Sequence, residues 1–165
     1  FDYIFDSTFY ANKQPEMYEK FSQFVLNKNK SIKIIKLGSR MKNNDVLFAG
    51  KIPFEQVKEC YRTSKLFVSF SENEGFGYPL AQSLLIGLPV IVWKNPTYIE
   101  ILGNSFPYFI TPEMSMQEIY ELGIQAVDDT QLSKENQQMI NEKLNPEILK
   151  EQWFDLIKEV ITNGK

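Results

Sequence analysis

Short apolar runs alternate with amphipathic stretches along most of this chain. The runs are rich in β-branched and aromatic residues and are mostly apolar on both faces, which is typical of strands in a covered parallel sheet. We expect strands at Tyr3–Phe5, Ile32–Leu37, Val46–Ala49, Leu66–Phe70, Pro89–Trp93 and Tyr108–Ile110.

The amphipathic stretches carry apolar residues at helical spacing. Pro79 suits the first turn of a helix and Gly87 suits its end, so this pair marks one helix clearly. Helices are expected at Glu16–Leu26, Phe54–Arg62, Pro79–Ile86, Tyr98–Leu102, Met116–Leu122 and Pro146–Ile161. The polar stretch Asp129–Asn145 is interpreted as a solvated helix or loop, and the pair Asp128 and Asp129 as charges flanking a helix rather than metal ligands.

Alternation of strands and helices predicts an α/β fold with right-handed crossovers. We expect one Rossmann-like, doubly wound domain spanning residues 1–165, with helices on both faces of a parallel sheet. Ligands of such sheets bind beyond the carboxyl ends of the strands, near the switch point. The loops that follow the expected strands are Asp6–Pro15, Gly38–Asn43, Gly50–Pro53, Ser71–Tyr78 and Lys94–Tyr98.

The last expected helix, Pro146–Ile161, is amphipathic and carries Trp153 among its apolar residues. Two interpretations stay open for its apolar side. The helix packs on this domain, or it crosses to a partner domain. Since the chain begins at Phe1 without Met, we expect it to be a fragment of a larger two-domain protein or a processed product.

Composition narrows the classes of function. A net charge of −3 argues against a nucleic-acid binder, which usually presents a basic face. The absence of histidine excludes Ser-His-Asp and Cys-His triads within this chain. The single cysteine, Cys60, excludes an internal disulfide and indicates a reducing compartment, so a cytoplasmic location is expected. Association with the inner face of a membrane, through a part outside this chain, stays open.

The stretch Ser71–Gln82 carries the clearest chemistry. An apolar strand ends in an acidic loop, two glycines allow close approach of a ligand to the backbone, and a helix begins at once. Free N–H groups at the helix start suit a diphosphate, whereas the carboxylate of Glu74 suits sugar hydroxyls or a developing positive charge. The simpler alternative is a tight turn with a solvated carboxylate, because a glycine pair alone is a weak signal.

The longer stretch Glu74-Gly-Phe-Gly-Tyr-Pro-Leu-Ala-Gln-Ser-Leu-Leu-Ile-Gly-Leu-Pro-Val-Ile closely resembles the signature of retaining glycosyltransferases of the GT-B fold, of the group 1 or family 4 type. The resemblance is specific from about Val46 to Gly103. It implies that the chain is the C-terminal, donor-binding domain of such an enzyme, with a Rossmann-like fold forming one half of the GT-B architecture.

The resemblance implies a role for each matched residue. Glu74 matches the first family glutamate, beside the donor sugar and diphosphate, and is the candidate catalytic residue. Donor contacts are expected from the loop Gly75, Phe76 and Gly77 and from Tyr78 and Pro79 at the helix start. Gln82 stands where the family has a second glutamate that bonds the nucleotide ribose. Because glutamine is uncharged, Gln82 can still bond a ribose hydroxyl, but without the charge assistance that a glutamate would give.

A second departure lies in the first loop, where the family places an arginine and a lysine on the diphosphate. Lys13 fits the lysine, with a solvated loop lysine as the alternative, but Thr8 stands at the arginine position. Arg40 could reach a nucleotide or lie on the surface. Lys51 and Ile52 match the family's base-side loop, where main-chain groups read the base.

The expected reaction is transfer of a hexose from a nucleoside-diphosphate sugar to an acceptor hydroxyl with retention, as in polysaccharide or glycan biosynthesis. The expected partners are the nucleotide-sugar donor, an N-terminal acceptor domain and a glycan or lipid-linked acceptor, with no nucleic acid. No cofactor or metal is expected, and the isolated domain is expected to be inactive. Two alternatives are an inactive donor-binding module and a Rossmann-like interaction domain that binds no nucleotide.

Overall fold

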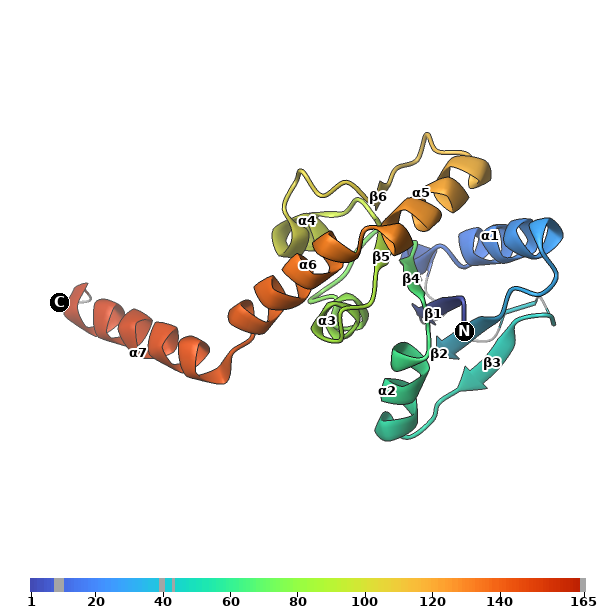
Figure 1. The fold of residues 1–165 in the computed structure, drawn as a ribbon. Helices are drawn as coiled ribbons and strands as arrows, with labels where there is room; N and C mark the ends of the chain where they lie inside the picture. Colours follow the sequence, from blue (N-terminus) through green and yellow to red (C-terminus); the bar gives the residue numbers. More distant parts are fainter. Residues whose placement is uncertain (8–10, 39–40, 43, 164–165) are drawn as a thin grey trace.

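The computed structural model describes residues 1–7, 11–38, 41–42 and 44–163 (Figure 1). Within these residues, a six-stranded sheet has the order β3-β2-β1-β4-β5-β6, and every neighbouring pair is parallel. The strands are β1 Tyr3–Ser7, β2 Ile34–Gly38, β3 Leu47–Gly50, β4 Leu66–Ser69, β5 Val90–Trp93 and β6 Phe109–Ile110. The strands lie where the apolar runs predicted them, with ends shifted by a residue or two.

Helices cover both faces of the sheet, as expected for a doubly wound fold. One face packs against α1 (Pro15–Lys28) and α5 (Met116–Asp128). The other packs against α2 (Phe54–Arg62), α3 (Tyr78–Leu85), α4 (Pro96–Leu102) and α6 (Thr130–Lys143). The α/β prediction is confirmed, and the strand order reverses between β1 and β4, so this pair forms the switch point.

The expectation of a solvated helix or loop at Asp129–Asn145 is only partly right. Asp129 caps α6 by accepting a hydrogen bond from the Leu132 backbone N–H, as helix-flanking charge predicts. However, Ile140 is only 2% exposed, and Gln137 Nε2 donates to the carbonyl of Leu85 at 2.9 Å. The helix therefore covers α3, because one buried face suffices to anchor a helix whose other faces are polar.

Helix α5 is longer than the sequence predicted, ending at Asp128 rather than Leu122. Gly123, a poor helix former, lies inside the helix and against the sheet. A Cβ at this position would come within 2.9 Å of Leu66 Cδ2, so glycine permits the helix to pack closely on β4. Close packing thus outweighs the local helix propensity of glycine.

Helix α7 (Pro146–Asn163) projects away from the rest of the domain as an arm (Figure 1). Its apolar side chains are exposed, with Trp153 at 64%, Phe154 at 55% and Leu156 at 49%. Of the two interpretations open from sequence, packing on this domain is therefore wrong for these residues. An uncovered apolar face of this kind usually marks an interaction surface.

Candidate functional site

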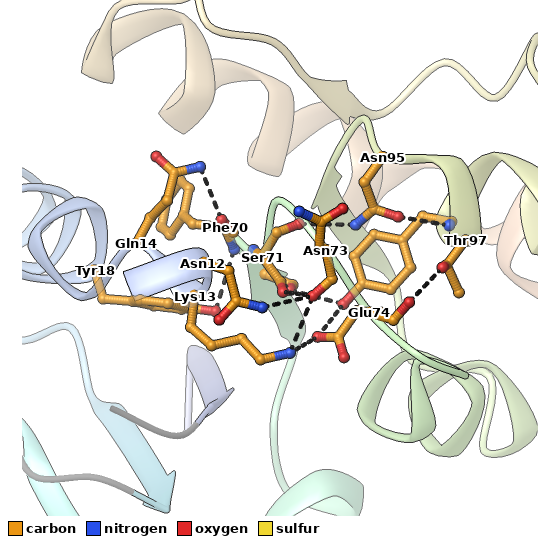
Figure 2. A network of polar contacts seen from close by, with 12 residues as sticks. Asn12, Lys13, Gln14, Tyr18, Phe70, Ser71, Asn73, Glu74, Asn95 and Thr97 are labelled. Carbon is orange, nitrogen blue, oxygen red and sulfur yellow. Dashed lines mark hydrogen bonds and ion pairs between the residues drawn. The ribbon is translucent and has the colours of Figure 1, made fainter. Parts of the chain in front are cut away.

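Two loops meet above the switch point. The short helix η1 (Ala11–Lys13) follows β1, and the acidic loop follows β4. The Lys13 ammonium lies 2.5 Å from Glu74 Oε1, and the two side chains are only 15% and 13% exposed. Figure 2 shows the two side chains pointing toward one another. Both residues are predicted from the sequence as separate members of the donor site, and the fold brings them together.

Main-chain groups hold these loops against each other. Asn12 Nδ2 donates to the carbonyl of Asn73 at 3.1 Å, and Lys13 Nζ reaches the same oxygen at 3.4 Å. The backbone N–H of Glu72 donates to the carbonyl of Asn12 at 2.8 Å. The ion pair therefore joins two loops, after β1 and β4, that hydrogen bonds to main-chain groups already hold together.

The loop after β5 supports the acidic loop from the other side (Figure 2). Asn95 caps α4 by accepting from the Tyr98 backbone N–H, and its Nδ2 donates to the carbonyl of Ser71 at 2.7 Å. Thr97 Oγ1 donates to the carbonyl of Glu74 at 2.7 Å. Since α4 begins at this loop, the start of that helix holds the backbone of the acidic loop, including Glu74, in position.

Tyr98 adds a side-chain contact to Glu74. Its hydroxyl donates to Glu74 Oε1 at 3.2 Å and lies 3.0 Å from Ser69 Oγ. Burial raises the pKa of this phenol, and the Glu74 carboxylate raises it further, so the hydroxyl stays protonated as a donor. Sequence reasoning missed Tyr98, because nothing local distinguishes it from an apolar helix residue.

The two glycines of the acidic loop have different environments. Gly77 precedes α3 with φ of 78°, a left-handed conformation, and a Cβ there would come within 3.0 Å of the Tyr98 ring. Gly75 has no heavy atom within 4 Å of such a Cβ. Only Gly77 is therefore required by this backbone, whereas Gly75 leaves open space beside the loop.

Helix α3 begins without a side-chain cap. Its first turn therefore keeps backbone N–H groups available, and the positive end of the helix dipole lies beside the acidic loop. The rings of Phe76 and Tyr78 flank this helix start, with centroids 4.8 Å apart and exposures of 44% and 69%. The helix start expected from the sequence is thus present and accessible.

The remaining expected donor residues take no part in this network. Gln82 lies in the second turn of α3, and its amide makes no hydrogen bond to any residue that the structure describes. Lys51 is exposed and Ile52 is half-buried, in the loop after β3 at the same edge of the sheet. Thr8 and Arg40 lie outside the described residues.

Two charged residues near the switch point were not expected from the sequence. Asp6, near the end of β1, accepts a hydrogen bond from Tyr61 Oη at 2.7 Å. Burial raises the pKa of its carboxyl group, while the Tyr61 hydrogen bond and the charge of Lys36 act in the opposite direction. Lys36 is buried in β2 at 3% exposure. Charged residues inside apolar strands are the sequence signal that could have found both.

Among the residues described, no cluster of three or more histidine, cysteine, aspartate or glutamate side chains is placed to bind a metal. No helix in the described part is long and apolar enough to cross a membrane.

Comparison with known proteins decides the family. Residues 19–145 match the family described as glycosyl transferases group 1, which is most of the chain. The chain belongs to this family. No curated protein sequence matches it significantly.

Solved structures of this class share the fold at low sequence identity. A variant of S. aureus TarM in complex with fondaparinux, α-GlcNAc-glycerol and UDP matches with a TM-score of 0.71 and 18% identity, over 94% of this chain and 35% of that one. The pneumococcal O-GlcNAc transferase GtfA with UDP and GlcNAc gives 0.68 and 19%, over 98% and 36%. Sucrose-phosphate synthase from Thermosynechococcus elongatus gives 0.75 and 16%, over 98% and 46%.

These matches place the chain in one half of the GT-B architecture, as the resemblance implied. The chain spans less than half the length of each of these three structures.

Proposed function

We propose that this chain is the donor-binding domain of a glycosyltransferase that transfers a hexose from a nucleoside-diphosphate sugar to an acceptor hydroxyl with retention. The observation that supports this most directly is the junction of Lys13 and Glu74 above the switch point. It joins a cation suited to phosphate with a carboxylate suited to sugar hydroxyls, at the edge where doubly wound sheets bind ligands. Two of the similar structures carry UDP in their names, so UDP is the first nucleotide to test.

The diphosphate would be held by Lys13 and by the uncapped start of α3. Backbone N–H groups and a helix dipole bind phosphate without a metal, and a lysine adds a point charge. Both lie beside the acidic loop. Negative charge builds up on the diphosphate as the sugar leaves, and the same groups would stabilise it.

The sugar and ribose would be recognised by neighbouring side chains. Glu74, oriented by Tyr98, would accept hydrogen bonds from sugar hydroxyls and is our candidate catalytic residue. Gln82, with no partner among the described residues, would bond the ribose through its amide. Main-chain groups at Lys51 and Ile52 would contact the base.

The acceptor would be bound by a second, N-terminal domain. Support comes from the share of the similar structures that this chain leaves uncovered and from the exposed apolar face of α7, which we assign to that domain. A glycan or lipid-linked acceptor fits this arrangement. The isolated chain would then bind a donor without transferring its sugar.

Calorimetric titration of the chain with UDP, GDP and their glucose and N-acetylglucosamine conjugates tests this function. We expect one nucleotide to bind, and Lys13→Met to weaken its binding by roughly 10- to 100-fold, since a charged hydrogen bond contributes about 1.5–3 kcal/mol. Lys20→Met, on the exposed side of α1, is the matched control. Failure of every nucleotide to bind, both to the chain and to the full-length protein, would refute the donor site.

A second candidate is a donor-binding module without transfer activity. The replacement of the family glutamate by Gln82 and of the family arginine by Thr8 favours it. Transfer or donor hydrolysis by the full-length protein decides between the two. Nucleotide binding without either reaction would identify the inactive module.

A further inference from the structure

Gln14, between η1 and α1, has an unusual backbone conformation. Among the non-glycine residues that the structure describes, it is the only one with a positive φ, at 47°, and its ψ is 59°. This left-handed region disfavours a residue that carries a Cβ, and glycine occupies it most readily. Such strain persists only where surrounding contacts impose it, and it is often found at functional sites.

The side chain of Gln14 makes a contact that holds the residue in this conformation. It does not cap α1, although Gln14 is the residue before the helix. Instead, its Nε2 donates to the carbonyl of Phe70 at 3.0 Å. Phe70 directly follows β4, so this bond joins the start of α1 to the base of the acidic loop. Figure 2 shows it in the same network as Lys13 and Glu74.

Tyr18, one helical turn further along, binds the other main-chain group of Phe70. Its hydroxyl accepts a hydrogen bond from the Phe70 backbone N–H at 3.1 Å, and Tyr18 is 1% exposed. The N–H and the carbonyl of one buried residue are therefore both bonded to side chains from the first turns of α1. Because buried main-chain groups need partners, this pair of bonds fixes the base of the acidic loop against α1.

The bond from Gln14 is independent of the Lys13 side chain. Lys13 comes directly before Gln14, and its ammonium contacts Glu74 and the carbonyl of Asn73. A diphosphate that binds this ammonium would compete with both contacts. The bond from Gln14 to Phe70 uses no atom of Lys13, so it would persist when the donor binds.

Both neighbours of Lys13 are thus bonded to the acidic loop. Asn12 bonds the carbonyl of Asn73 in an exposed contact, whereas the bond from Gln14 is partly buried. Resting on the function proposed above, we propose that Gln14 is a positioning residue of the donor site: its bond to Phe70 keeps Lys13 directed at the diphosphate after the ion pair with Glu74 has opened. A lysine held in place beforehand loses less conformational entropy on binding, which raises the affinity.

Two substitutions at Gln14 separate positioning from stability. Gln14→Met keeps the length of the side chain and the left-handed strain but removes the donor, so its urea midpoint should fall. Gln14→Gly also removes the donor but relieves the strain, so its midpoint should fall less. Both variants should bind UDP about threefold to tenfold more weakly in calorimetry, the range that one neutral hydrogen bond represents.

Two further variants show whether the effect passes through Lys13. Gln137→Met removes a matched amide bond, to the carbonyl of Leu85 at the C-terminal end of α3, and should leave UDP affinity unchanged. In a Lys13→Met background, Gln14→Gly should weaken UDP binding no further, because residues that act through one interaction are not additive.

The outcomes separate this inference from the proposed function. If the wild-type chain binds UDP and both Gln14 variants match it, Gln14 has no role in binding and the donor site stands. An equal loss from Gln14→Gly with and without Lys13 would also overturn the inference, because Gln14 would then act by another route. If no nucleotide binds to the wild-type chain or to the full-length protein, the proposed function fails and this inference fails with it. Should Gln14→Met not fold, Gln14→Gly decides alone, since it carries no left-handed strain.

Discussion

Lys13 Nζ lies 2.5 Å from Glu74 Oε1, across the point where the strand order reverses. Each group is therefore neutralised by the other before any ligand arrives. A diphosphate would compete with Glu74 for the lysine, and the released carboxylate would be free to accept hydrogen bonds from the sugar. Because of this exchange of partners, a change at Glu74 should affect binding of the diphosphate and binding of the sugar differently.

Replacing Glu74 with glutamine should separate phosphate binding from sugar binding. The change frees Lys13, so we expect bare UDP to bind a few-fold more tightly, while a UDP-sugar loses the carboxylate as a charged acceptor and gains less or binds more weakly. Calorimetry with both ligands measures the difference. Glu72→Gln, exposed in the same loop, is the control. Equal changes for both ligands would contradict the assigned role of Glu74.

The two glycines of the acidic loop should respond differently to alanine. Gly77→Ala places a Cβ against the Tyr98 ring in a left-handed backbone, which costs about 1–2 kcal/mol of unfolding free energy. Gly75→Ala meets no neighbour, so its cost should be well below that of Gly77→Ala. Urea denaturation of the two variants measures both. A larger loss at Gly75 would contradict the described loop geometry.

Removing the Tyr98 hydroxyl should affect the orientation of Glu74. Tyr98→Phe loses its hydrogen bonds to Glu74 and Ser69, so we expect a loss of about 1 kcal/mol of unfolding free energy. UDP-sugar affinity should fall more than UDP affinity. Tyr120→Phe, whose hydroxyl makes no hydrogen bond among the described residues, should change neither. Unchanged sugar selectivity in Tyr98→Phe would show that Glu74 is oriented by other groups.

The buried Lys36 should make stability depend on pH. Its pKa is about 8 in the folded chain, below the ordinary lysine value of 10.5. Between these values the unfolded chain binds more protons, so the free energy of unfolding should rise as pH increases from about 8. Urea denaturation between about pH 7 and pH 9.5 should show this rise in the wild type and less of it in Lys36→Met. Identical pH profiles would mean that the ammonium is not buried in solution.

The exposed apolar side chains of α7 should contribute little to the free energy of unfolding of the isolated chain. Trp153 is 64% exposed, so Trp153→Ser should change the free energy of unfolding by less than about 0.5 kcal/mol, as surface substitutions do. Leu84→Ala, at 1% exposure, should cost about 2–5 kcal/mol in the same measurement. A loss at Trp153 comparable to that at Leu84 would show that α7 folds back onto this domain in solution.

Sequence patterns alone predicted the strands, most helices and the position of the acidic loop. These features depend on local periodicity and turn residues, which a single stretch of chain records. They failed at α5, which continues past the predicted end at Leu122 and through Gly123, where the close approach of Leu66 favours glycine inside the helix. They also undervalued α6, since Ile140 looks isolated in the sequence until the packing of α6 on α3 is known.

By itself, the sequence determined the α/β class and, through the Glu74-to-Ile91 signature, the glycosyltransferase family. Only the tertiary structure decided that Lys13 meets Glu74, that Tyr98 bonds the same carboxylate, and that Lys36 reaches the end of β1. The physical reason is that these contacts join segments distant in sequence. Their distances follow from the order of strands in the sheet, and that order depends on burying both faces at once rather than on any local pattern.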